Sequence, residues 1–198
     1  MPFDTFLSLL GLAVAAAWTP GPNNALVASS GATFGLRRTV PHVLGIALGF
    51  PLMIFLVGLF LGELFQASAL LRETLRWGGA ALMLWVAWQI ARSGGLGARG
   101  AAPRPFTFVE AAGFQWINPK AWAMAVGVTA QFISGAAPLV TAGIVAATFV
   151  AVGLLSASTW AGAGRILTRW LTTDDRLTWF NRVMAGLIVV SVMLLFRG

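Results

Sequence analysis

Long apolar runs, separated by short breaks that hold most of the charged residues, constrain the fold of this chain more than any other feature. Hydrophobic residues make up 58% of its 198 residues and charged residues 10%. In an average soluble domain about a quarter of the residues are charged. Because a bilayer core needs about 20 apolar residues per helix, this length allows six closely connected spans. The pattern therefore predicts one all-α integral membrane domain over residues 1–198.

The breaks between the apolar runs divide this domain into six predicted transmembrane helices. These cover residues 3–30, 39–62, 69–92, 106–134, 139–162 and 179–196. The segment 93–105 is rich in Gly, Ala, Pro and Arg, which is typical of an irregular loop. We expect this loop to join two halves of three spans each, 1–92 and 106–198.

The distribution of the basic residues predicts how the spans are oriented. Nine arginines fall on one side of the predicted spans and three on the other. The first side holds Arg37, Arg38, Arg92, Arg99, Arg104, Arg165, Arg169, Arg176 and Arg182, and the second holds Arg72, Arg76 and Arg197. Arginine and lysine accumulate in cytoplasmic loops. We therefore expect the loop 93–105 to be cytoplasmic and both termini to be periplasmic, in a bacterial inner membrane.

The remaining composition excludes several classes of function. The net charge of +7 comes from residues between the apolar runs rather than from one basic face, so it indicates topology and not nucleic-acid binding. The absence of cysteine excludes disulfides, thiolate metal sites and thiol redox chemistry. Only an acidic residue, Asp4, precedes the first apolar run, whereas a secretory signal opens with basic residues. We therefore expect the first helix to be retained.

A proline-rich segment interrupts the first predicted span, and its residues are Pro20, Gly21, Pro22, Asn23 and Asn24. Proline within a helix removes a backbone hydrogen bond and clashes with the preceding turn, so we expect the helix to unwind here. Such a break survives in a membrane only where protein or a wet cavity satisfies the freed carbonyl groups. A half-helix that restarts at Asn23 or Asn24 presents free N–H groups suited to a carboxylate. We predict a substrate-binding site here, and a packing kink is the alternative.

A second break, in the fourth predicted span, consists of Asn118, Pro119 and Lys120. Lys120 lies about 12 residues from the cytoplasmic entry, which at about 1.5 Å per residue places it near the midplane. An unpaired charge there costs at least about 3 kcal/mol. We therefore expect Lys120 to face the bundle interior and to bind carbonyl groups, an anion or a carboxylate. These three residues join the predicted substrate site, and the alternative is that Lys120 snorkels or pairs structurally.

The two breaks point to a repeat, because Trp18 and Trp116 each precede a proline break in the first helix of a half. With three spans per half, the second half enters the membrane from the opposite side, so the repeat is inverted, as in many secondary transporters. We expect a 3+3 inverted repeat whose first and fourth helices are broken, and whose two breaks meet in space.

Two further polar residues are candidates for coupling transport to an ion. Glu110 lies one turn into the fourth span, where it reaches Lys120 only if the helix break permits it. His42, at the cytoplasmic end of the second span, titrates near neutral pH when it is unperturbed. An interfacial histidine without a function is the alternative for His42.

Small residues at a regular spacing mark the second predicted span. Gly45, Gly49, Gly58 and Gly62 form two small-xxx-small pairs, a spacing that lets helix backbones approach closely. We expect packing within the chain rather than dimerisation, although a homodimer stays open.

Four motifs follow one another along the whole chain: Thr19-Pro20-Gly21-Pro22-Asn23-Asn24, residues 35–38, Gly45-Ile46-Ala47-Leu48-Gly49 and Asn118-Pro119-Lys120-Ala121. With these motifs in this order, the chain resembles the LysE/RhtB amino-acid exporters of bacteria. Ala28-Ser29-Ser30, Trp77-Gly78-Gly79-Ala80 and Trp85-Val86-Ala87-Trp88 are most similar to the branch that exports cysteine and O-acetylserine.

The resemblance implies a secondary active transporter rather than an enzyme. It implies export of small amino acids or derivatives, of the homoserine, threonine, cysteine and O-acetylserine class, by proton antiport and alternating access. The expected partners are the substrate, protons and lipid, with no cofactor and no nucleic acid. Cation efflux is the alternative, because relatives in the same superfamily move metal ions. Metal sites need clustered carboxylate, His or Cys ligands, of which the spans offer almost none, so we predict no metal site.

Overall fold

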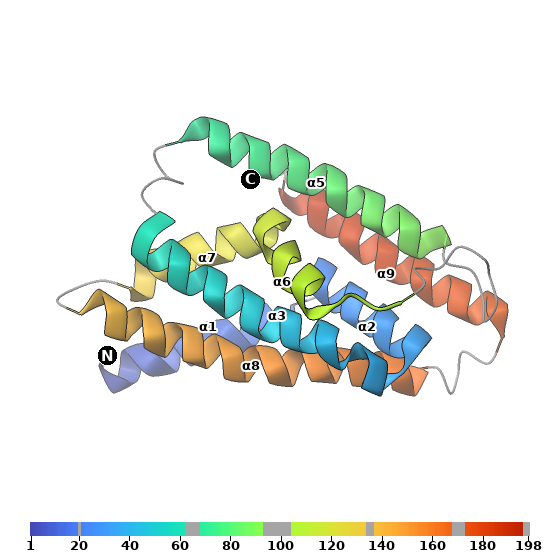
Figure 1. Cartoon of the computed structure of the whole chain (residues 1–198), viewed down its shortest axis with the longest axis horizontal. Helices are drawn as coiled ribbons and strands as arrows, with labels where there is room; N and C mark the ends of the chain where they lie inside the picture. The colour runs from blue at the N-terminus through green and yellow to red at the C-terminus, as the bar shows by residue number, and fades with distance from the viewer. Residues whose placement is uncertain (20, 62–67, 93–103, 134–136, 168–172, 196–198) are drawn as a thin grey trace.

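The computed structural model describes residues 1–19, 21–61, 68–92, 104–133, 137–167 and 173–195, and within these ranges every regular element is a helix (Figure 1). The first half contains α1 (Phe3–Trp18), α2 (Pro22–Phe34), α3 (Leu36–Leu56) with its π-helical continuation η1 (Val57–Leu61), and α5 (Ala69–Arg92). The second half contains α6 (Phe108–Ile117), α7 (Pro119–Phe132), α8 (Pro138–Leu167) and α9 (Asp174–Leu195). The loop predicted at 93–105 lies almost wholly outside the described residues.

Local sequence signals explain where several helices begin. Thr107 and Glu110 form a reciprocal capping box at the start of α6. Pro22 and Pro119 each occupy the first position of their helix, where the missing N–H of proline costs nothing. Gly35, with φ of 78°, makes the turn between α2 and α3 in a conformation that favours glycine.

The first and fourth predicted spans are each two helices. The axes of α1 and α2 are bent by 56°, and together these helices form one candidate membrane span. Residues 36–60 and 138–166 are each long and apolar enough to cross a membrane without a break. The all-helical class is thus confirmed in the described part of the chain, whereas the full six-span, 3+3 arrangement stays a prediction.

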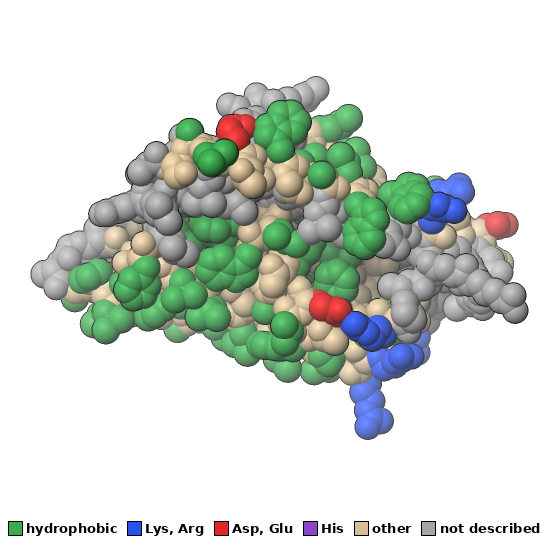
Figure 2. All heavy atoms as spheres, turned by 45° about the horizontal axis from the view of Figure 1, so that its top comes forward, with side chains coloured by type: hydrophobic (Ala, Val, Ile, Leu, Met, Phe, Trp, Pro, Cys, Tyr) green, Lys and Arg blue, Asp and Glu red, His purple; other side chains and the backbone are tan. Residues whose placement is uncertain are grey.

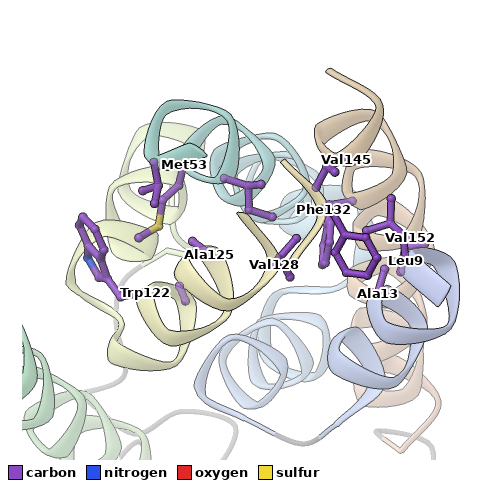
Figure 3. Packing of buried hydrophobic residues seen from close by; sticks show 13 residues of the cluster. Leu9, Ala13, Met53, Trp122, Ala125, Val128, Phe132, Val145 and Val152 are labelled. Carbon is purple, nitrogen blue, oxygen red and sulfur yellow. The ribbon is translucent and has the colours of Figure 1, made fainter. Parts of the chain in front are cut away.

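Two groups of helices meet along α2 (Figure 1). In one group α3 packs against α8 and α6, and α1 packs against α8. In the other, α5 packs along α9, and α2 contacts both α8 and α9. A buried apolar cluster fills the space between α1, α3, α7 and α8, and its fully buried members include Leu9, Met53, Ala125 and Val145 (Figure 3). Both α1 and α7, which lie next to the two breaks, contribute side chains to this cluster.

Glycines allow the closest helix contacts. A Cβ on Gly45 would lie 2.5 Å from the carbonyl oxygen of Phe108, and one on Gly49 would lie 2.6 Å from Cα of Ala112. A Cβ on Gly58 would lie 2.5 Å from the side chain of Ile133. The predicted role of this glycine series in packing within the chain is therefore confirmed for its first three members, and Gly62 lies outside the described residues.

Basic side chains gather toward one end of the molecule, as Figure 2 shows for the face in view. Arg37 and Arg38 begin α3, Arg92 and Arg165 lie in the last turns of α5 and α8, and Arg104 precedes α6. The start of α1 lies at the opposite end of the long axis (Figure 1). The fold thus brings these five arginines, which are scattered through the sequence, toward one end.

Candidate functional site

The two breaks lie in contact, although about 100 residues separate them in the sequence. Nζ of Lys120 donates a hydrogen bond to the carbonyl oxygen of Thr19 at 3.2 Å. Gly21 lies beside the same ammonium, because a Cβ placed on Gly21 would be 2.9 Å from Nζ of Lys120. The second break therefore contributes a cation directly to the first.

Side chains satisfy the carbonyl groups that the first break frees. Nδ2 of Asn24 donates to the carbonyl oxygens of both Ala17 and Thr19, at 3.0 Å each. Oγ of Ser156, on α8, donates to Ala17 at 2.7 Å, and Lys120 is the second donor to Thr19. Each carbonyl oxygen thus accepts two hydrogen bonds, as many as it has lone pairs. This is how an unwound backbone is tolerated within the bundle.

A second polar link joins the halves beside the break. Nδ2 of Asn23 donates to Oε1 of Gln115 at 2.8 Å, and Nε2 of Gln115 donates back to Oδ1 of Asn23 at 3.3 Å. Nε2 of Gln115 also donates to the carbonyl oxygen of Ala111 at 2.9 Å. Gln115 is fully buried, so these bonds have little competition from water. The reciprocal pair fixes the start of α2 against α6.

The two half-helices that follow the breaks differ at their N-termini. Oδ1 of Asn118 accepts a hydrogen bond from the backbone N–H of Lys120 at 3.0 Å and so caps α7. The N-cap residue of α2, Gly21, makes no side-chain cap. α2 restarts at Pro22, slightly earlier than predicted, and the N–H groups of Asn23 and Asn24 belong to its first turn. The N-terminus of α2 is therefore the better place for an anion.

A pocket lies between the breaks, α3 and α8. The space open to the centres of water-sized molecules is about 80 Å³. One water needs roughly 10–15 Å³ by this measure, so the pocket is large enough for a small organic molecule. Its polar wall consists of residues from both breaks together with Gln115 and Ser156. Its apolar wall includes Phe50, Met124 and Phe149. The rings of Phe50 and Phe149 meet edge to face, with their centroids 5.5 Å apart.

Most of the predicted substrate residues line this one pocket, namely Gly21, Pro22, Asn23, Asn24, Asn118 and Lys120. Pro20 lies outside the described residues. Pro119 begins α7, but its side chain is not among those described. Sequence reasoning missed Gln115, a polar residue one turn before the second break, and Ser156, the first of three neighbouring hydroxyl residues in a long apolar run. The only signal for either residue was its polarity.

Glu110 is not brought to Lys120. Its carboxylate oxygens accept hydrogen bonds from both guanidinium nitrogens of Arg104, at 2.6 and 2.7 Å, and from the backbone N–H of Thr107 at 2.8 Å. Glu110 and Arg104 are exposed, and Glu110 is not part of the pocket wall. These hydrogen bonds raise the pKa of Arg104 above its usual value.

His42 is buried by neighbouring parts of the chain. Only 1% of the residue is exposed. Its Nδ1 lies 3.0 Å from Oγ of Ser30, and its ring packs against Phe106 with the centroids 5.1 Å apart. The burial arises because α2 and the segment before α6 pack against this part of α3. Like Glu110, His42 lies outside the pocket wall.

Within the described ranges, no three His, Cys, Asp or Glu residues are grouped closely enough to hold a metal ion. The pocket instead combines one ammonium, a helix N-terminus, neutral amides and an apolar wall. This set of groups suits a small molecule that carries a carboxylate and a hydrogen-bond donor.

Comparison with known proteins decides the family. A family model described as LysE type translocator matches residues 14–198. The chain belongs to this family. As a LysE type translocator with long apolar helices, it is a multi-pass membrane protein.

Curated relatives of this LysE type translocator carry more specific names. It is 31% identical over 179 residues to a cysteine/O-acetylserine efflux protein of Klebsiella pneumoniae, with 87% of each chain covered. Proteins of the same name in Salmonella typhimurium and Escherichia coli K12 are 29% and 28% identical over 181 residues, with 91% of each chain covered. No solved structure matches. The resemblance to the amino-acid exporters, including their cysteine and O-acetylserine branch, is confirmed.

Proposed function

We propose that this translocator exports small amino acids or their derivatives, of the homoserine, threonine, cysteine and O-acetylserine class, across the bacterial inner membrane. The family and the names of the similar proteins support export of this kind. The observation that carries the proposal is the pocket in which the two helix breaks meet around Lys120.

The substrate-binding residues in this proposal are Pro20, Gly21, Pro22, Asn23, Asn24, Asn118, Pro119 and Lys120. A zwitterionic amino acid complements the chemistry of their pocket. The N-terminus of α2 and the ammonium of Lys120 offer positive partners for its carboxylate. Carbonyl and amide oxygens, among them those of Thr19 and Asn23, offer acceptors for its ammonium. Phe50, Met124 and Phe149 leave an uncharged surface for a small neutral side chain.

Alternating access around the two broken helices, driven by proton antiport, is the proposed mode of transport. The breaks join α1 to α2 and α6 to α7, so each supplies a point at which a half-helix can rotate. His42 and Glu110 remain candidates for the coupling residues, and neither lines the pocket. In this arrangement the arginine-rich end faces the cytoplasm and both termini are periplasmic.

Cation efflux is not favoured, because a pocket that contains an ammonium and a helix N-terminus repels cations. Transport through everted membrane vesicles separates the two functions. Vesicles with this protein, supplied with radiolabelled amino acids, should accumulate small neutral ones only when a proton gradient is present. Lys120→Met should reduce this uptake by about tenfold or more, as expected for the loss of a charge-assisted hydrogen bond. Vesicles that take up metal ions and no amino acid would overturn the proposal.

A further inference from the structure

The carbonyl oxygens of the first break differ in how firmly their partners are held. Ala17 accepts hydrogen bonds from two neutral side chains, Asn24 and Ser156, and the bond from Ser156 is short, at 2.7 Å. Thr19 accepts one bond from Asn24 and a longer one, at 3.2 Å, from the end of the Lys120 side chain. Thr19 is exposed. Its carbonyl therefore has one exchangeable partner.

That partner, the ammonium of Lys120, has unused bonding capacity. A lysine ammonium has three donors, and Thr19 takes one of them. Among the described residues no carboxylate lies within ion-pair distance of it, and Glu110 instead pairs with Arg104. The flexible stem of Lys120 can carry the charge from one acceptor to another.

The N-terminus of α2 lies next to the same ammonium. Gly21 is the N-cap residue of α2, and its Cα approaches Lys120 so closely that a Cβ would lie 2.9 Å from Nζ. A carboxylate bound to the first N–H groups of α2 would therefore lie beside Lys120 and attract it more strongly than a neutral carbonyl does.

We propose that Lys120 acts as a stand-in for the ammonium of the substrate. When an amino acid enters, its carboxylate binds at the N-terminus of α2 and draws Lys120 away from Thr19, and its own ammonium replaces Lys120 on the Thr19 carbonyl. After the exchange the Thr19 carbonyl still accepts two hydrogen bonds, and Lys120 is paired with the carboxylate of the substrate. This inference rests on the proposed function and assigns the two ends of the substrate to separate partners.

The exchange makes the two charged groups of a ligand depend on each other. A ligand with an amine but no carboxylate leaves Lys120 bound to the Thr19 carbonyl, and the positive charge of Lys120 repels the amine. An acid without an amine draws Lys120 away but leaves Thr19 with one partner fewer. Three compounds that share a thiol test this dependence. Cysteine carries both the amine and the carboxylate, cysteamine carries only the amine, and 3-mercaptopropionate carries only the carboxylate.

The first experiment measures binding of these three compounds to purified wild-type protein under reducing conditions, by competition with a radiolabelled amino acid. Cysteine should bind at least about tenfold more tightly than either analogue. Saturating 3-mercaptopropionate should raise the affinity for cysteamine by about fivefold or more, because it vacates the Thr19 carbonyl. Independent or mutually exclusive binding of the two analogues would overturn the exchange.

Variants of Lys120 give the second experiment. Lys120→Met should weaken cysteine binding and strengthen cysteamine binding by about tenfold, since Thr19 is then free of competition. Lys120→Arg should keep the preference for cysteine. Ser156→Ala, which removes a donor from Ala17 and not from Thr19, should leave the ratio of the two affinities within about twofold. Size-exclusion profiles establish that each variant is folded.

The outcomes separate this inference from the function on which it rests. If the wild-type protein binds cysteine but Lys120→Met gains no affinity for cysteamine, the exchange is wrong while amino-acid export stands. If the wild-type protein neither binds nor transports any amino acid of the panel, the proposed function itself is wrong.

Discussion

Gly21 lies where a side chain would disturb the site, although its backbone does not demand glycine. Its φ of −170° and ψ of 179° describe extended backbone that other residues also adopt. A Cβ would instead meet Nζ of Lys120 at 2.9 Å and its Cδ at 3.3 Å. Glycine is thus needed here because it leaves space for the Lys120 ammonium, and not because the backbone adopts an unusual conformation.

Substitution of Gly21 by alanine should therefore affect binding more than stability. The added methyl group displaces the flexible end of Lys120, which can move, rather than any backbone atom. We expect Gly21→Ala to lower the affinity for a transported amino acid by about tenfold, as expected when a charged hydrogen bond is lost. Gly11→Ala, on α1, adds a methyl group with nothing within 4 Å and is the control. A melting temperature that falls sharply while the affinity is retained would contradict this explanation.

The helices α2 and α8 approach each other closely through a reciprocal pair of glycines. A Cβ on Gly31 would collide with the backbone carbonyl of Ala161, and one on Gly164 would collide with the backbone carbonyl of Ala28. Neither obstacle is a side chain that can turn away. The backbones are in contact because these positions carry no side chain, as is common where helices pack in lipid.

Gly164→Ala should separate α2 from α8 and destabilise the protein by about 1–3 kcal/mol, the usual cost of overpacking. Gly162→Ala is the matched control, since it lies one turn or less away on the same helix with nothing within 4 Å of its added Cβ. Thermal unfolding in detergent compares the two variants. Equal melting temperatures would show that the α2–α8 contact is looser than described.

The sequence predicted both helix breaks, because proline acts locally and its effect on a helix does not depend on distant residues. It could not predict which side chains satisfy the freed carbonyls. Ser156 and Gln115 come from other helices, and neither belongs to a sequence motif or a periodic pattern that marks it as a partner of the break. The burial of His42 was likewise not predictable, since it depends on Ser30 and Phe106, which only the fold brings near.

Across the whole molecule, the charges distinguish the two ends of the bundle. Arginines lie at the start of α3, just before α6 and at the ends of α5 and α8, and Figure 2 shows basic side chains gathered toward one end of the face in view. The start of α8 lies toward the opposite end, near the start of α1 (Figure 1). Because the chain contains no cysteine, a single introduced thiol reports on one position without background.

Labelling with a membrane-impermeant maleimide tests the predicted orientation. Leu139→Cys, at the exposed start of α8, should react in intact spheroplasts, whereas Arg38→Cys should react only in everted vesicles. The reason is that arginine-rich segments remain in the cytoplasm. The unmodified chain should stay unlabelled in both preparations. The reverse pattern would place the termini in the cytoplasm.

The contacts between the two breaks also bear on how the protein is made. Ala17 and Thr19 are synthesised long before Ser156 and Lys120, so during insertion the unwound segment lacks two of its final partners. Asn24 is the exception, because it follows within a few residues and donates to both carbonyls. The first span therefore enters the bilayer with a local partner of its own, and the distant ones arrive only when the second half of the chain has emerged from the ribosome.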